Sequence, residues 1–215
     1  MRIAVLISGR GSNLKALIDA CAAEDFPAEI GLVLSNRPNA SGLLHAEEAG
    51  IPHKVIDHKE FKTREEFDAV LHRTLEDAEI ELVCNAGFMR ILTDDFVNRW
   101  RDRMLNIHPS LLPAFKGLHV HQRAIDAGVR LSGATVHFVR PEMDEGPIVA
   151  QVAVPVLPDD TADVLAERIL EAEHKLYPFA LRLVAEGKAR VADERVVISD
   201  GSAEAPAPIF MPPLD

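Results

Sequence analysis

Short apolar runs rich in β-branched residues alternate with longer helical patterns along the first half of the chain. The short runs predict strands at Ile3–Ile7, Glu29–Leu34, His53–Ile56 and Leu82–Asn85. The longer patterns between them predict helices at Asn13–Ala22, Gly42–Ala49 and Arg64–Ala78. Because strand and helix alternate in this way, right-handed crossovers should build a doubly wound parallel sheet.

The pattern changes after Arg90. It predicts a short helix at Asp94–Arg99, a strand at Met104–Ile107, a helix near His119–Ala127 and two extended runs at Ser132–Val139 and Ile148–Pro155. The apolar positions of Thr161–Glu186 predict a long amphipathic helix, which Pro178 either kinks or divides in two. We therefore expect the α/β class: a Rossmann-like, doubly wound, mostly parallel sheet flanked by helices, with an antiparallel extension in the second half.

Length and composition set the expected number of domains. The chain has 215 residues, of which 47% are apolar, and this is enough to fill one hydrophobic core. We expect a single domain over residues 1–198, followed by a Pro-rich, acidic and mobile tail over residues 199–215.

Charge and cysteine content exclude several classes of partner. The 34 acidic and 23 basic side chains give a formal net charge of −11, so a broad basic face for nucleic acid is not expected. Cys21 and Cys84 lie in apolar stretches, as buried thiols of a reducing compartment do. The first apolar run is too short for a signal peptide, and no run approaches the roughly 20 residues of a membrane span. We expect a cytoplasmic protein without nucleic-acid or membrane partners, either a monomer or a homodimer.

A glycine-containing loop follows the first predicted strand and opens the first predicted helix. Its sequence is Ser8-Gly9-Arg10-Gly11-Ser12-Asn13, and free backbone N–H groups at a helix start favour an anion. Leu14 stands where a dinucleotide fingerprint requires a third glycine, and the Gly-Lys-Ser/Thr run of an ATP-binding loop is missing. The loop therefore favours a simple phosphate monoester, unless it merely connects strand to helix.

Two polar side chains alternate at the end of the predicted strand Met104–Ile107. Asn106 and His108 should point to the same side, at the sheet edge where open α/β sheets bind their ligands. An amide can stabilise an oxyanion and an imidazole can transfer a proton, which suits acyl transfer through a tetrahedral intermediate. Asp144, in the loop between the two extended runs, would favour the protonated imidazole and fix its tautomer if it folded back over His108. A core histidine and a solvated acidic turn remain the alternatives.

Nine histidines raise the question of a metal site, especially His119 and His121 together with His108 and His137. Neither Cys-x-x-Cys nor His-Glu-x-x-His occurs, so we expect no metal and assign these histidines to packing and to a polar network around His108. On the long predicted helix, Glu173 and Tyr177 share a face. Glu173 could hold an amine or ribose hydroxyls if that face lines a cleft.

Five sequence motifs resemble those of the phosphoribosylglycinamide formyltransferase family, and the resemblance runs from Arg2 to about Arg190. They are Ser8-Gly-Arg-Gly-Ser-Asn13, Asn85-Ala-Gly-Phe-Met-Arg-Ile-Leu92, Asn106-Ile-His-Pro-Ser-Leu-Leu-Pro113, Gly117-Leu-His-Val-His121 and Gly133-Ala-Thr-Val-His-Phe-Val139. The family moves a formyl group from 10-formyltetrahydrofolate, a co-substrate, to glycinamide ribonucleotide in purine synthesis.

The resemblance implies roles for particular residues. Asn106, His108 and Asp144 match the catalytic trio of the family. The phosphate of the ribonucleotide would contact Gly11, Ser12 and Asn13. Other parts of the ribonucleotide would contact Leu170, Glu171, Ala172 and chiefly Glu173. Because Leu170 is apolar, a contact there would use its backbone. The folate would contact Arg64, Met89, Arg90, Ile91, Leu92, Asn106, Arg140, Pro141, Glu142, Met143 and Asp144.

Related activities give the competing hypotheses. A formyltetrahydrofolate hydrolase would use water as acceptor, but that family resembles this one with an additional N-terminal regulatory domain, whereas Met1 leads directly into the first strand. Methionyl-tRNA formyltransferase would carry a C-terminal RNA-binding domain, for which this chain ends early and is too acidic. A non-catalytic phosphate- or nucleotide-binding module would leave Asn106, His108 and Asp144 without a role.

Overall fold

The computed structural model describes residues 1–199 and 210–211. Most of the predicted tail at 199–215 lies outside the described residues, so the division into one domain and a tail stays a prediction. Within the described part of the chain, no helix is both long and apolar enough to cross a membrane.

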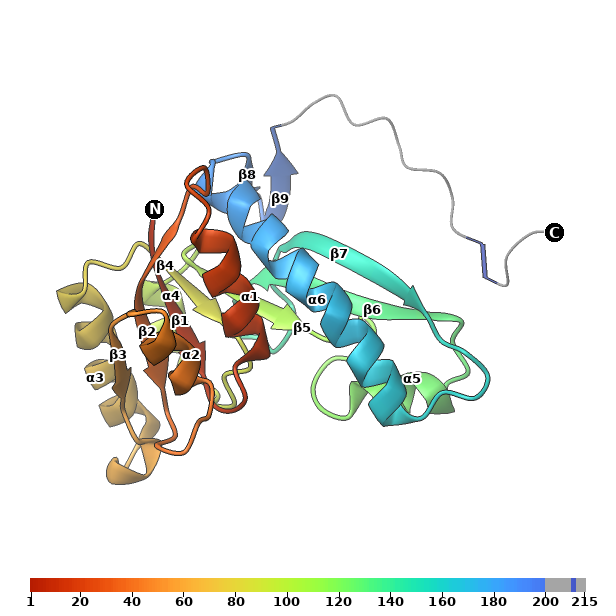
Figure 1. Ribbon diagram of the computed structural model, residues 1–215, viewed down its shortest axis with the longest axis horizontal. Helices are drawn as coiled ribbons and strands as arrows, with labels where there is room; N and C mark the ends of the chain where they lie inside the picture. The colour runs from red at the N-terminus through yellow and green to blue at the C-terminus, as the bar shows by residue number, and fades with distance from the viewer. Residues whose placement is uncertain (200–209, 212–215) are drawn as a thin grey trace.

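Seven strands form one sheet in the order β3-β2-β1-β4-β5-β6-β7 (Figure 1). The strands β1 to β5 run parallel to one another, whereas β6 pairs antiparallel with both β5 and β7. The predicted fold class is therefore confirmed. The strands are β1 (Arg2–Ile7), β2 (Glu29–Ser35), β3 (His53–Val55), β4 (Leu82–Asn85), β5 (Met104–His108), β6 (Leu131–Phe138) and β7 (Ile148–Pro155).

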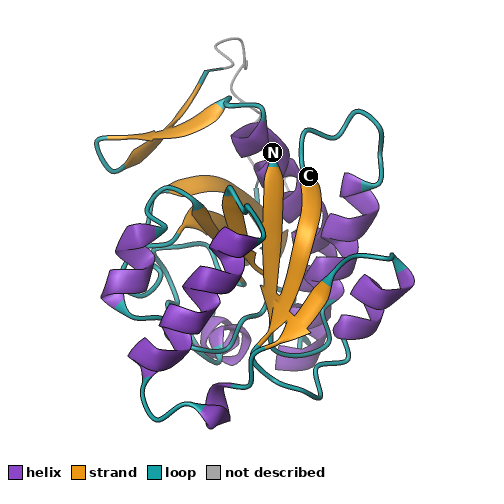
Figure 2. Cartoon of the chain, turned by 90° about the vertical axis from the view of Figure 1, so that its left-hand side faces the viewer, coloured by secondary structure: helices purple, strands orange, loops and turns teal. Residues whose placement is uncertain are grey.

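Helices cover both faces of this sheet (Figure 2). Alternate residues of β1 enter different cores: Ile3, Val5 and Ile7 pack in the core that α1, α5 and α6 complete, whereas Ala4 and Leu6 pack in the core of α3 and α4. The helices are α1 (Ser12–Cys21), α2 (Leu43–Glu48), α3 (Arg64–Asp77), α4 (Asp94–Arg99), α5 (Val120–Asp126) and α6 (Ala162–Ala185), with a short 3-10 helix at His58–Glu60.

Threonine side chains cap three of the helices. The Oγ1 atoms of Thr63, Thr93 and Thr161 each accept a hydrogen bond from the backbone N–H three residues later, at 3.2, 3.3 and 3.3 Å. Helix α6 continues past Pro178, so the expectation that this proline divides it in two is wrong.

A two-stranded hairpin near the end of the described chain was not predicted from the sequence. It consists of β8 (Ala189–Ala192) and β9 (Arg195–Ile198), and Asp193 and Glu194 form its turn with φ angles of 49° and 55°. Two-residue turns with positive φ usually contain Asn-Gly or Asp-Gly. The Asp-Glu pair gives no such signal, which explains why the hairpin was missed.

Candidate active site

The polar residues singled out in the sequence gather where the sheet changes its winding direction. The chain proceeds from β1 outwards to β2 and β3 and then returns to β4 on the other side of β1. In such sheets a crevice forms beyond the carboxyl ends of the two strands at this point. Gly11 follows β1, Arg90 follows β4, and His108 ends β5, so the three predicted segments meet at one edge of the sheet.

His108 and Asp144 lie side by side, which confirms the proximity that the sequence could only suggest. The Nδ1 atom of His108 lies 3.4 Å from an Asp144 carboxylate oxygen, and the two side chains are 8% and 9% exposed. The other ring nitrogen, Nε2, donates to the backbone carbonyl of Phe115 at 3.0 Å. Asp144 is held in turn by the N–H of Gly117 at 2.9 Å.

Asn106 contacts a histidine that was not among the predicted site residues. Its Nδ2 atom donates to Nε2 of His137 at 3.3 Å, and Nδ1 of His137 donates to the carbonyl of Phe138 at 3.0 Å. Burial lowers the pKa of His137, although the Phe138 carbonyl and Asp144 oppose the shift, so the ring is neutral and free to accept from the amide. His137 belongs to the polar network around His108, as the sequence analysis expected.

A cavity of about 440 Å³ lies beside Arg10, in the loop that leads into α1, and beside Pro109, the neighbour of His108. Arg10, Pro109, His121, Asp163, Ala166, Glu167, Ile169, Leu170 and Glu173 line it. Among the described residues no side chain caps the start of α1, where Gly11 has a φ of 72°, so its first N–H groups remain available to an anion. The stretch 170–173 divides: Leu170 and Glu173 face this cavity, whereas Glu171 and Ala172 line a separate hollow against β7.

Glu173 is buried at the wall of this cavity. Its carboxylate accepts a hydrogen bond of 2.7 Å from Nδ2 of Asn13, whose Oδ1 atom has no partner among the described residues. Burial raises the pKa of Glu173 to about 7, and the bond from Asn13 only partly offsets this effect. Tyr177, on the same helix face, instead donates to the backbone carbonyl of Asn85 inside the core.

Glu173 should therefore make stability depend on pH. A carboxyl whose pKa is raised on folding contributes its full share to the free energy of unfolding at pH values below its unfolded pKa. This stabilisation is lost as the pH rises through the folded pKa of about 7. The Glu173→Gln variant has no ionisable group at this position. Between pH 4.5 and pH 8, its free energy of unfolding should therefore rise by about 3 kcal/mol relative to that of the wild type. Denaturant titrations at both pH values measure this difference. If the difference in free energy of unfolding between the variant and the wild type is the same at both pH values, folding does not raise the pKa of the Glu173 carboxyl.

Gly11 has no room for a side chain. A Cβ atom added there would lie 2.7 Å from Cα of Gly42, and the positive φ is itself unfavourable for other residues. We expect Gly11→Ala to lower the free energy of unfolding by about 1–3 kcal/mol. Gly9→Ala is the matched control, since nothing among the described residues lies within 4 Å of a Cβ at Gly9. Equal stability of the two variants by chemical denaturation would refute the steric argument.

A second cavity, of about 190 Å³, lies beside the polar cluster. Its lining includes Arg90, Ile91, Leu92, Asn106, Arg140, Pro141, Met143 and Asp144 of the predicted folate contacts, together with Asn85, Phe88, Val97, His137 and Val139, which were not predicted. Arg64, Met89 and Glu142 do not line it. The predicted folate contacts thus come together around one cavity, apart from these three.

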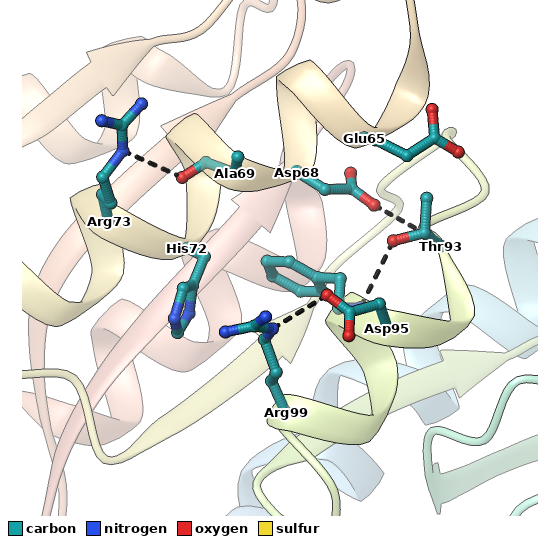
Figure 3. Close-up of a pocket in the computed structure, with 9 residues that line it drawn as sticks. Glu65, Asp68, Ala69, His72, Arg73, Thr93, Asp95 and Arg99 are labelled. Atoms are coloured by element: carbon teal, nitrogen blue, oxygen red, sulfur yellow. Dashed lines mark hydrogen bonds and ion pairs between the residues drawn. The ribbon is translucent and has the colours of Figure 1, made fainter.

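Hydrogen bonds at both ends fix the segment 89–92 beside this cavity. At one end the N–H of Met89 donates to Oγ of Ser8 at 2.7 Å. At the other end the N–H of Thr93 donates to the buried carboxylate of Asp68 at 2.7 Å, in the hollow between α3 and α4 (Figure 3). Burial raises the pKa of Asp68, while the hydrogen bonds to Thr93 and the charges of Arg90 and Arg64 oppose the shift. Arg64 and Arg90 therefore lie near the same carboxylate.

No group of three or more His, Cys, Asp or Glu side chains in the described part of the chain is arranged to hold a metal ion. In the His108–Asp144–His137 cluster, the Asp144 carboxylate oxygens lie 3.4 Å from Nδ1 of His108 and 3.8 Å from Nε2 of His137.

Comparison with known proteins agrees with this architecture. The formyl transferase family model matches residues 1–181. The chain is 44% identical to phosphoribosylglycinamide formyltransferase of Haemophilus influenzae, over 94% of this chain and 95% of that protein. A crystal structure of glycinamide ribonucleotide transformylase 1 from Symbiobacterium toebii superposes with a TM-score of 0.89 at 45% identity, over 92% of this chain and 93% of that one.

Longer relatives match as well. The trifunctional purine biosynthetic protein adenosine-3 of Gallus gallus is 52% identical over 90% of this chain, which spans 19% of that protein. The fold and the site therefore define a member of the formyl transferase family. Within it, the chain belongs to the phosphoribosylglycinamide formyltransferases.

Proposed function

We propose that the chain transfers the formyl group of 10-formyltetrahydrofolate to the amine of N1-(5-phospho-D-ribosyl)glycinamide, a step of purine biosynthesis. One observation carries the proposal: the Asn106, His108 and Asp144 cluster adjoins two cavities, since Asn106 and Asp144 line one and Pro109, the neighbour of His108, lines the other. The cavity at the start of α1 suits a phosphorylated amine, and the cavity beside residues 89–92 and 140–144 suits the folate. Two substrates held in this way would meet at His108.

The ribonucleotide would bind through the uncapped N-terminus of α1. The N–H groups of Gly11, Ser12 and Asn13 are the candidates for its phosphate, and Arg10 lines the same cavity. Leu170 and Glu173 face this space, so these two are the candidates from α6, with Glu173 as a hydrogen-bonding partner for the amine or the ribose hydroxyls. Glu171 and Ala172 are less suited, because they line a different hollow.

The chemistry needs no nucleophile from the protein. The substrate amine would attack the formyl carbon, form the new C–N bond and leave a negative oxygen on the tetrahedral carbon. Asn106 has a second amide N–H beyond the one given to His137, and this N–H could stabilise the oxyanion. The bond to the folate nitrogen would then break as His108 supplies the proton that the nitrogen needs, and the proton that the amine gives up would pass to His108 and restore its starting state. Asp144 would hold the His108 ring in its orientation.

The folate would approach through the second cavity. The backbone of Met89–Leu92 and of residues 140–144 would hold its ring system. Arg64 and Arg90, which lie near the same buried carboxylate of Asp68, are the candidates for its glutamate carboxylates. These two arginines and the α1 N-terminus would let an acidic protein bind two anionic substrates.

Release of deformylated folate, followed with and without glycinamide ribonucleotide, tests this proposal. Release that depends on the ribonucleotide supports the transferase. Equal release in its absence would make the protein a hydrolase that uses water as acceptor, and no release under either condition would favour a binding module.

A further inference from the structure

The guanidinium of Arg140 is fully engaged by the protein itself. Its Nε atom donates to Glu194 at 2.7 Å, Nη2 donates to Asp102 at 2.6 Å, and Nη1 donates to the carbonyl of Val139 at 3.0 Å. The side chain is only 5% exposed. Arg140 lines the second cavity, so a folate contact at this position would have to use its backbone or its aliphatic stem.

The two carboxylates come from turns that are distant in sequence. Asp102 lies in the turn between α4 and β5, with a φ of 59°, and Glu194 lies in the turn of the β8–β9 hairpin. Glu194 also pairs with Arg101 in the same turn as Asp102. These contacts join three segments, and the hydrogen bond from Arg140 lowers the pKa of Glu194, so that its carboxylate is charged at neutral pH.

Arg140 stands at the narrow base of the loop that carries Asp144. Opposite strands meet there, because the N–H of Phe138 donates to the carbonyl of Pro147 at 2.9 Å. At Gly146 an added Cβ would lie 1.7 Å from the Phe138 carbonyl oxygen and 3.4 Å from Cγ of Arg140. The stem of Arg140 thus lies against the returning end of the loop. A shift of its guanidinium would move both ends of residues 140–146.

We propose that Glu194 of the C-terminal hairpin is a positioning residue for the loop 140–144, which it holds in its folate-receiving position through Arg140. The inference rests on the proposed function, because that function makes this loop the binding surface of the formyl donor. A buried guanidinium that loses one of two carboxylates must find another partner or water, and either outcome moves the side chain. The hairpin therefore acts on the active site without touching substrate.

Glu194→Ala tests the role by separating the kinetic constants. We expect the KM for 10-formyltetrahydrofolate to rise about three- to tenfold. The kcat should fall by a smaller factor, because Gly117 and His108 still hold Asp144, and the KM for the ribonucleotide should change less than about twofold. Glu194→Gln keeps an acceptor for Nε of Arg140 and should restore part of the loss. Glu186→Ala is the control, since Glu186 is also ion-paired, to Lys188 and Arg182, but lies at the end of α6.

Amide hydrogen exchange gives a readout that does not depend on activity. Faster exchange at residues 141–146 in Glu194→Ala supports positioning through Arg140. Faster exchange confined to 189–198, with an unchanged folate KM, would overturn the inference and leave Glu194 only a hairpin-stabilising role. If wild-type protein transfers no formyl group, the proposed function fails, while the exchange experiment still decides whether the hairpin holds the loop.

Discussion

Replacing His108 with alanine is expected to lower kcat by about 10²–10⁴-fold, the contribution typical of a positioned acid–base group. The KM values of both substrates should change little, because the two cavities are lined mainly by other residues. The ring of His108 lies against Asp144, and in the proposed mechanism it supplies the proton to the leaving folate nitrogen. Steady-state kinetics on purified variant, with its fold verified by circular dichroism, measures the effect.

His53→Ala is the control for this experiment. His53 lies exposed on β3, which β2, β1 and β4 separate from β5 in the sheet, and its Nδ1 atom donates to the backbone carbonyl of Ile51 at 3.2 Å. It should retain wild-type turnover. Full turnover in a folded His108→Ala protein would remove His108 from the mechanism.

Replacing Asn106 with alanine is expected to lower kcat by about 10²–10³-fold, as loss of one oxyanion-stabilising donor does. The amide gives one N–H to His137 and has another to give to the tetrahedral oxygen. The loss should appear in kcat rather than in the KM for the ribonucleotide, because the oxyanion exists only near the transition state.

Asn106→Asp distinguishes oxyanion stabilisation from mere packing. Aspartate has nearly the same shape but places negative charge where the oxyanion forms, so turnover should fall at least as far as in Asn106→Ala. If Asn106→Asp were folded and near wild type in kcat, Asn106 would only support His137.

The sheet was predictable because its signals are local. Buried runs such as Ile3–Ile7 and Leu82–Asn85 need only their own residues to be recognised as strands, and the glycines after β1 mark the turn into α1. Alternation along one strand also placed Asn106 and His108 on one side. The carboxyl end of that strand is where open α/β sheets bind their ligands, which is why these two residues could be proposed as site residues from the sequence.

Contacts between distant segments were not predictable in the same way. His137 faces Asn106 because the two are paired across β5 and β6, and this antiparallel register cannot be read from either strand alone. Helix α6 likewise presents Glu173 to one cavity and Glu171 to another, since neighbours on a helix are about 100° apart. The Arg140–Glu194 contact depends on a hairpin whose turn gave no signal.

The most direct test of the account follows the formyl carbon itself. Protein is incubated with 10-formyltetrahydrofolate carrying ¹³C in the formyl group and with glycinamide ribonucleotide, and all products are analysed by mass spectrometry. Direct attack by the amine predicts one labelled carbon in each formylglycinamide ribonucleotide, in equal amount to deformylated folate, with no label on the protein. Label recovered as formate, or attached to the protein, would contradict it.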